Sequence, residues 1–264
     1  MALWKLKTGH GPVIVDVPHA GVEIPEAIAA RLTPAALARP DTDWHVEKLY
    51  DFAAEFDATL MCATHSRYVV DLNRDPSGSA LYPGADNTEV CPTRTFASEP
   101  VYLDGGAPQP REVAERIEEY FTPYHARLAA EIARVRARHG YAVLLDGHSI
   151  RSEVPRFFAG RLPDLNLGTA NGASAAPSLQ ARAEAVLKGA DGFTHVVNGR
   201  FTGGWITRHY GRPREGVHVL QLEVGERCYM DEAPPYPWDP ARAAALVTVL
   251  RALVATLAAW QPRR

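Results

Sequence analysis

The sequence has 264 residues, a formal net charge of −3, 46% hydrophobic and 22% charged residues. This composition argues against a disordered chain, a collagen-like repeat or a disulfide scaffold, and the length is ample for a buried core. A near-neutral chain has no global basic field to attract nucleic acid or anionic lipid, so we expect a small-molecule substrate and neither a nucleic-acid nor a membrane partner.

Six short apolar runs, rich in β-branched residues, predict strands that are covered on both faces. In chain order they span residues 13–17, 59–63, 68–72, 141–145, 195–197 and 217–222. Helical patterns lie between several of them, and an alternation of strands and helices is typical of an α/β protein.

Three longer segments have the apolar period of a helix. The first spans residues 43–56 and the second spans residues 111–139, where Pro123 should kink the helix or start a new one because it has no N–H. The third, at residues 243–260, approaches membrane-spanning length. Arg251 lies at its middle, so insertion would be costly and we expect an Ala-rich helix packed on the core.

Stretches rich in Pro and Gly at residues 75–86, 104–110 and 162–177 are predicted to be loops. No shift in composition marks a domain boundary, so we expect one domain over residues 1–264. Ligands of such folds collect at the carboxyl ends of the strands, and the polar residues that follow each run are therefore the site candidates.

Two histidines follow predicted strands, His19 after the first run and His148 after the fourth. A hydrolytic zinc site takes three ligands from His and Asp/Glu and leaves a position for water, so both are imidazole candidates. Asp43 and Glu23 compete for the third position. Taken alone, Asp43 is explained at least as well as the cap of the helix at residues 43–56, and Glu23 better as a solvated loop carboxylate.

Two further carboxylates lie at strand ends. Asp146 is a candidate for orienting His148 rather than for binding metal. Glu223 occupies an apolar strand at residues 217–224, where an unpartnered carboxylate is costly to bury, so it should face a metal, a cation or a water-filled pocket. A general base acting on a metal-bound water and an ion pair with an arginine are equally good interpretations of Glu223.

Arg74, Arg151 and Arg208 are candidates for binding an anionic substrate, because guanidinium groups grip carboxylates at two points. Arg67 is a further candidate, although surface solvation, the commoner fate of arginine, weighs most on it. The chain has no GxGxxG, P-loop or Gly-x-Ser-x-Gly pattern, so neither nucleotide binding nor a serine nucleophile is indicated. Cys91 could be a nucleophile only if a histidine approached it.

The chain has three cysteines, an odd number, widely spaced and with no CxxC pair. They fit neither a disulfide framework nor a thiolate zinc site, and they are typical of a reducing compartment. The first eight residues lack the apolar stretch of a signal peptide. We therefore expect a cytoplasmic protein.

Five motifs in this order resemble the N-formylglutamate amidohydrolase family of histidine breakdown. They are VPHAG at 17–21, DTDW at 41–44, RYVVDLNR at 67–74, DGHS at 146–149 and QLE at 221–223. The resemblance covers nearly the whole chain and extends to residues 203–208 and 228–232. The DLNR segment also resembles the aspartoacylase and succinylglutamate desuccinylase group, relatives of zinc carboxypeptidases.

The resemblance implies a single α/β domain with a mixed, mostly parallel central sheet and helices on both faces, a phosphorylase/hydrolase-like fold related to zinc carboxypeptidases. It also implies one divalent metal, zinc with cobalt as the alternative, with His19 and His148 as ligands. The related enzymes take a Glu three residues after the first His, where this chain has Val22. We therefore choose Asp43 over Glu23 as the third ligand.

The same resemblance implies Glu223 as the base and Asn73 and Arg74 as substrate contacts. From their places in the sequence, we expect Arg74, Arg151 and Arg208 to bind the substrate carboxylates and to stabilise the oxyanion. The implied activity is metal-dependent hydrolysis of the amide C–N bond of N-formyl-L-glutamate to formate and L-glutamate. Two alternatives stay open: a deacylase of another N-acyl amino acid or amide, and a non-catalytic binding protein on the same fold. The oligomeric state is not predicted.

Overall fold

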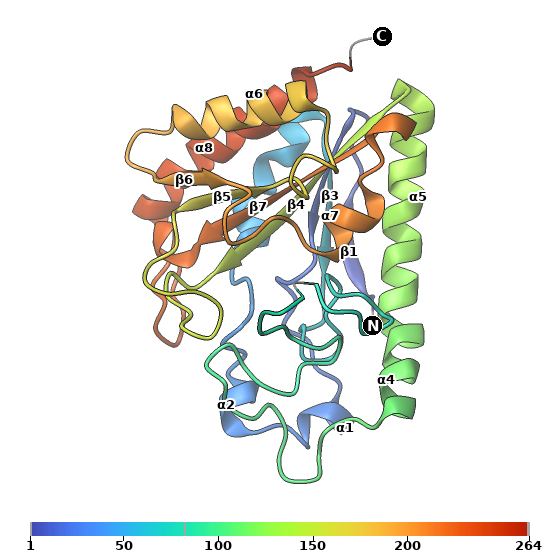
Figure 1. Cartoon of the computed structure of the whole chain (residues 1–264), viewed down its shortest axis with the longest axis vertical. Coiled ribbons are helices and arrows are strands. Elements are labelled where there is room, and N and C mark those ends of the chain that lie inside the picture. The colour runs from blue at the N-terminus through green and yellow to red at the C-terminus, as the bar shows by residue number, and fades with distance from the viewer. Residues whose placement is uncertain (1, 82, 263–264) are drawn as a thin grey trace.

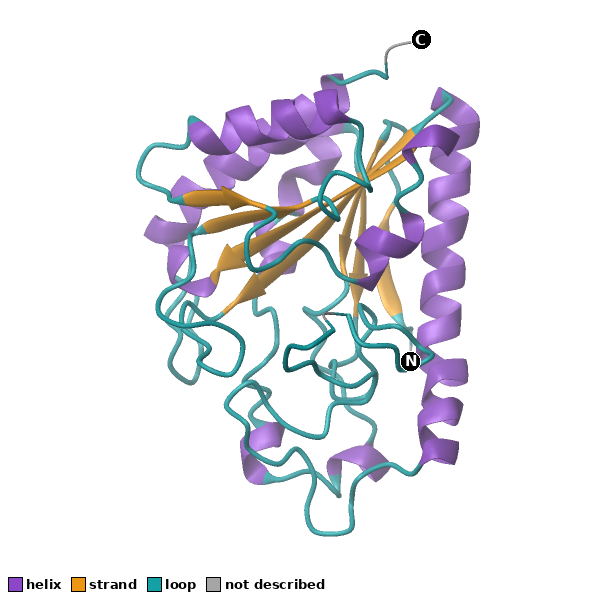
Figure 2. Ribbon diagram, in the orientation of Figure 1, coloured by secondary structure: helices purple, strands orange, loops and turns teal. Residues whose placement is uncertain are grey.

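The computed structural model describes residues 2–81 and 83–262, and it confirms the predicted α/β fold (Figures 1 and 2). The strands of its mixed sheet are β1 (Trp4–Lys7), β2 (Val13–Val17), β3 (Thr59–Ala63), β4 (Ala142–Ile150), β5 (Leu165–Gly168), β6 (His195–Val197) and β7 (Val217–Gly225). They lie in the order β1-β3-β2-β4-β7-β5-β6. Strands β3, β2, β4 and β7 are parallel to one another, as are β5 and β6, whereas β1 is antiparallel to β3 and β5 to β7.

Helices cover both faces of this sheet. They are α1 (Glu26–Ala29), α2 (Pro34–Leu37), α3 (Val46–Leu49), α4 (Pro110–Arg116), α5 (Thr122–His139), α6 (Pro177–Lys188), α7 (Trp205–Tyr210) and α8 (Pro240–Ala259). In Figure 1, α5 lies along one side of the sheet and α6 and α8 lie on the other. Long loops gather at the carboxyl ends of the parallel strands (Figure 2).

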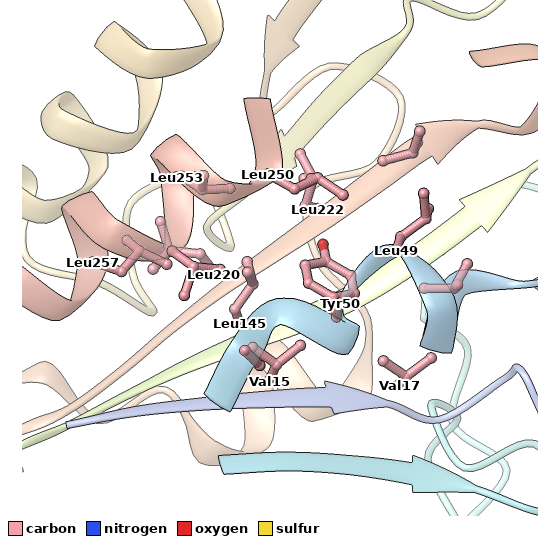
Figure 3. Close-up of a cluster of buried hydrophobic side chains, with 14 of the residues drawn as sticks. Val15, Val17, Leu49, Tyr50, Leu145, Leu220, Leu222, Leu250, Leu253 and Leu257 are labelled. Carbon is pink, nitrogen blue, oxygen red and sulfur yellow. The ribbon is translucent and has the colours of Figure 1, made fainter. Parts of the chain in front are cut away.

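Side chains alternate between the two faces of each central strand and so build two cores. Val15, Leu145 and Leu220 are neighbours across β2, β4 and β7, and they belong to a fully buried cluster that includes α3 and α8 (Figure 3). The preceding residue on each strand packs with α5 on the opposite face. Burial of each such side chain contributes about 1.5–3 kcal/mol, so the sheet is a rigid base for whatever its ends carry.

The helix α8 is long and apolar enough, by length and composition alone, to cross a membrane. Its residues Leu250, Leu253 and Leu257 are fully buried in the same core as Leu220. Arg251 points its guanidinium to Glu55 on η1 (Asp51–Phe56). The predicted packing of this helix on the core is therefore confirmed.

The predicted strand at residues 68–72 is wrong, because this segment forms turns. Its backbone does not pair with a neighbouring strand, and its polar side chains bond to distant residues. The Tyr68 hydroxyl donates to Asp41 Oδ2 at 2.7 Å, and Asp71 Oδ1 accepts from His19 Nε2 at 2.7 Å. The apolar run reflects burial of the segment and not strand pairing.

The predicted helix at residues 43–56 divides into α3 and the 3-10 turn η1. Before α3 the chain passes through His45 at φ 62°, and no side chain caps the helix. The interpretation of Asp43 as a helix cap is therefore wrong.

Two other predicted segments also differ from the structure. The loop at residues 162–177 contains β5, and the helix at residues 111–139 is interrupted before Pro123 by a π-helical turn, η2 (Ile117–Phe121). Strand β4 runs further than predicted, so His148 lies inside a strand and not after it, whereas β7 contains Glu223 as predicted.

Candidate metal and catalytic site

The candidate site lies at the carboxyl edge of the parallel strands. His19 follows β2 by two residues, while His148 and Glu223 face each other in the register of β4 and β7. Because parallel strands end at the same edge, side chains that are more than 100 residues apart in the sequence meet there. The sheet itself therefore positions two imidazoles and a carboxylate.

Asp43 completes a group of three possible metal ligands. One donor atom each from His19, Asp43 and His148 lies within 4.8 Å of the others, and all three side chains are buried. Asp43 Oδ2 lies 3.0 Å from His148 Nδ1 and 3.8 Å from His19 Nδ1. Glu23 is not part of this group; it pairs with His65 in an isolated bridge. The loop after α2 thus brings Asp43 to the histidines.

A buried carboxylate holds the outer nitrogen of each imidazole. Asp71 Oδ1 lies 2.7 Å from His19 Nε2, and Asp146 Oδ1 lies 2.8 Å from His148 Nε2. Metal-binding histidines use such partners to fix the ring and its tautomer, which here leaves both Nδ1 atoms turned toward Asp43. Two imidazoles and a carboxylate, each imidazole so oriented, fit a divalent metal such as zinc. The predicted orienting position of Asp146 is observed, while Asp71 had been noted only as part of a motif.

The ionisation of the two histidines differs. Burial lowers the pKa of His19 to about 4, and the nearby Arg67 charge acts in the same direction, so this ring is neutral at pH 7. Burial also disfavours the charged form of His148, but the Asp146 and Asp43 carboxylates overcome it and raise the pKa of His148 well above its usual value. A metal takes the deprotonated nitrogen of each ring, so its binding would release a proton from His148.

Glu223 lines a cavity of about 60 Å³ together with His19 and His148. Burial raises the pKa of Glu223 to about 8. Within the described part of the chain its carboxylate accepts one hydrogen bond, from Gln221 Nε2 at 3.5 Å, and it forms no ion pair with Arg67. The carboxylate is thus buried, open to the cavity and weakly bonded, which is the state of a group that can exchange protons.

The position of Arg67 in the structure differs from the predicted one. Arg67 is 6% exposed and lines the same cavity, so its interpretation as a solvated surface residue is wrong. Its guanidinium contacts His19 Nδ1 and lies 3.6 Å from Asp43 Oδ1. Burial opposes its charge, but Asp71, Asp43 and neighbouring carboxylates raise the pKa of Arg67 above its usual value. In the sequence, the feature that points to a role for Arg67 in the site is its place before the DLNR motif.

Asn73 and Arg74 both line the cavity, but their bonds differ. Asn73 Oδ1 accepts from the Ile206 backbone N–H at 2.8 Å, and its Nδ2 donates to Asp146 Oδ2 at 3.3 Å. The Asn73 amide therefore links α7 to Asp146, the carboxylate that contacts His148. Arg74 donates from Nε to Thr88 Oγ1 and from Nη1 to the Asn73 carbonyl, and its Nε lies 4.0 Å from Asp71 Oδ2; among the described residues its Nη2 has no hydrogen-bond acceptor.

The remaining two predicted arginines lie farther out. Arg208 lines an adjoining cavity of about 220 Å³ and donates to the Leu81 carbonyl at 2.8 Å, and Leu81 lines both cavities. Arg151 lines neither. It lies near enough to Asp41 and Glu226 for its charge to oppose the rise that burial causes in their pKa values. The structure thus brings Arg74 to the site, Arg208 next to it and Arg151 behind it.

Cys91 is buried, and its thiol donates to the Val69 carbonyl. Burial raises its pKa to about 11. A nucleophilic cysteine needs a depressed pKa and a nearby base, so this thiol is inert.

Comparisons with known proteins indicate the same family that the sequence motifs resemble. A family model described as N-formylglutamate amidohydrolase matches residues 11–230. N-formylglutamate deformylase of Pseudomonas aeruginosa is 48% identical over 258 residues, covering 98% of this chain and 97% of that protein. The enzyme of the same name from Pseudomonas putida is 43% identical over 256 residues, covering 97% and 96%. The crystal structure of N-formylglutamate amidohydrolase from Ralstonia eutropha superposes with a TM-score of 0.81 at 26% identity, covering 98% and 97%.

Proposed function

The chain belongs to the N-formylglutamate amidohydrolase family, and on that premise we propose that it hydrolyses N-formyl-L-glutamate to formate and L-glutamate, as in histidine breakdown. The observation that carries the proposal is one small cavity lined by two members of the three-ligand group, His19 and His148, and by the buried carboxylate of Glu223. A protein that only binds its ligand has no need of a proton-exchanging group beside a metal site.

His19, Asp43 and His148 are the residues we assign to a divalent metal, which we propose is zinc, with cobalt as a substitute. Such an ion, when bound, lowers the pKa of a water and polarises an amide carbonyl. Asp71 and Asp146 hold the two imidazoles in the orientation that this binding requires.

Glu223 is the group we assign to proton transfer. It takes one proton from the attacking water and gives it to the amide nitrogen as the C–N bond breaks, so that glutamate leaves as a neutral amine and the acyl product is formic acid. The acid proton then passes to the amine, which gives formate and the ammonium form of glutamate. Burial raises the pKa of Glu223, while the charges of His148 and Arg67 lower it and a bound divalent metal would act in the same direction. A carboxyl group balanced in this way can take the water proton in the first step and give it to the nitrogen in the second.

The arginines bind and neutralise negative charge. Arg67 reaches His19 Nδ1 on the side that faces Asp43. A nitrogen that binds metal has no lone pair left for a guanidinium, so Arg67 then turns to the carbonyl oxygen, where negative charge develops during attack. We assign Arg74 to the nearer glutamate carboxylate and Arg208, in the adjoining cavity, to the farther one.

We further propose that the chain is one domain that works in a reducing cytoplasm. Two observations support this: one sheet carries the site, and Cys62, Cys91 and Cys228 are all buried and free. Free thiols persist in compartments that keep cysteines reduced.

The test is formate release from N-formyl-L-glutamate by protein that is freshly purified, stripped by a chelator, or stripped and reloaded with zinc or cobalt. We expect activity to vanish on stripping and to return with metal. Glu223→Gln should keep its metal and lose activity by about 10²–10⁴-fold. The matched control is Glu226→Gln, another buried carboxyl of raised pKa that lies outside the cavity and should remain active. Absence of formate under every condition would refute the proposed substrate.

A further inference from the structure

The cavity around the candidate site has a polar side and an apolar side. The polar side carries the groups to which the proposed function gives roles. The apolar side is formed by Leu81, Phe96, Ile150, Phe157 and Phe201. A wall of this kind cannot take part in proton transfer, but it can decide which groups fit against the reacting carbon.

Phe96 is the phenylalanine of this wall that packs on Arg67, the arginine beside the candidate metal ligands. Its ring centroid is 5.0 Å from the guanidinium carbon of Arg67, which in turn contacts His19. Phe157 lies behind it, edge to face at 5.1 Å, and Phe201 packs on Phe158 and Arg200. Phe96 therefore forms an inner layer and the other two phenylalanines an outer one.

The Phe96 ring is held so that it cannot retreat easily. It is 6% exposed, and its backbone N–H donates to Asp41 Oδ2 at 2.9 Å. Arg156 braces the layer behind it: its guanidinium lies over Phe157, bonds to Asp86 at 2.9 Å and donates to the Thr95 carbonyl at 2.9 Å. Both the residue before Phe96 and the ring behind it are thus fixed.

Space beside the ring is scarce. A cavity of about 60 Å³ holds only a handful of waters, at roughly 10–15 Å³ for each. If Arg67 binds the carbonyl oxygen, the carbonyl carbon lies about 1.2 Å away from that oxygen. Any substituent on this carbon then lies beside the guanidinium, in the space next to the Phe96 ring.

We propose, on the premise of the proposed function, that Phe96 is the specificity-determining residue that restricts the acyl group to formyl. A formyl carbon carries hydrogen at this position, whereas an acetyl carbon carries a methyl group that meets the ring. One methyl group in an apolar pocket changes kcat/KM by about 10–200-fold. The wall thus selects against N-acetyl substrates by its shape, and its one contact with the residues that carry the chemistry is the packing of Phe96 on Arg67.

The experiment compares kcat/KM for N-formyl-L-glutamate and N-acetyl-L-glutamate on metal-loaded enzyme. For Phe96→Ala we expect the acetyl-to-formyl ratio to rise by about 10-fold or more. Phe96→Leu, a smaller change, guards against loss of folding and should raise the ratio less. The matched control is Phe201→Ala, which opens the same cavity from the outer layer and should leave the ratio unchanged.

A second readout does not depend on turnover. Calorimetry with N-acetyl-L-glutamate in the Glu223→Gln background should show tighter binding once Phe96→Ala is added. Equal hydrolysis of both substrates by the parent protein, or an unchanged ratio in both Phe96 variants, would overturn the inference while leaving the deformylase function intact. A parent protein that releases no formate at all would overturn both.

Discussion

Replacement of Asp71 by asparagine should weaken metal binding by about 10- to 100-fold while leaving every proposed metal ligand in place. Asp71 Oδ1 lies 2.7 Å from His19 Nε2, and both side chains are buried. A hydrogen bond to a charged group contributes about 1.5–3 kcal/mol, and each 1.4 kcal/mol is a factor of ten in affinity. An amide can also turn its N–H toward Nε2, which would put the ring proton on Nδ1, the nitrogen that faces Asp43.

The assay is a competition titration of stripped protein against a chromophoric chelator, with zinc and then with cobalt. The control is Asp164→Asn, which removes the ion pair with Arg227 at 2.7 Å and leaves both histidines untouched. We expect the control to bind metal like the parent protein. An Asp71→Asn protein that folds as stably as the parent and binds metal equally well would refute the assigned role of Asp71 in fixing His19.

Three other predictions concern packing and charge away from the metal ligands. Leu145→Ala should lower the free energy of unfolding by about 2–5 kcal/mol, measured in urea, because its side chain is fully buried between strands and helix; a loss below 1 kcal/mol would contradict this packing. A Cβ added at Gly204 would lie 2.4 Å from the Asn73 amide, so Gly204→Ala should lower both Tm and bound metal, and a fully loaded variant of normal Tm would argue against it. Hydrogen bonds from Arg31 lower the pKa of Glu112 to about 2 in the fold, against about 4.3 in an unfolded chain. This pair therefore stabilises the fold above pH of about 4.3, by about 1 kcal/mol for a partly exposed pair, and the contribution disappears as the pH falls toward 2. Stability curves of Glu112→Gln and of the parent should converge in acid, and a constant offset at all pH values would exclude the carboxylate as the cause.

The pattern of apolar residues predicted a strand correctly where the buried residues also pair with a neighbouring strand. Residues 13–17 and 59–63 became β2 and β3 with the predicted bounds. Residues 68–72 have the same pattern, but Tyr68 and Asp71 take polar partners from distant segments, and no local window contains that information. Four-residue β5 was missed because Asn166 and Gly168 alternate with its two leucines inside a stretch rich in Pro and Gly, which is typical of a loop.

The part of the candidate site that could be predicted is the part where the ends of parallel strands converge. His19 and His148 follow from that rule together with the resemblance to the family. Asp43 could be separated from a helix cap only by its 3.0 Å approach to His148, which lies 105 residues away. Arg67 could not be recognised as buried, because the carboxylates that compensate its charge are brought to it by the fold.

The residues that line the cavity stand on two kinds of backbone. His148 and Glu223 stand on paired strands at the centre of the sheet, whereas Phe96, Phe157 and Phe201 stand on connecting segments. Loops accept substitutions and changes of length that a buried strand does not. Relatives can therefore diverge in the substrates they accept while their hydrolytic apparatus stays fixed, and a mutant library confined to these loops would explore new acyl groups with little risk to folding.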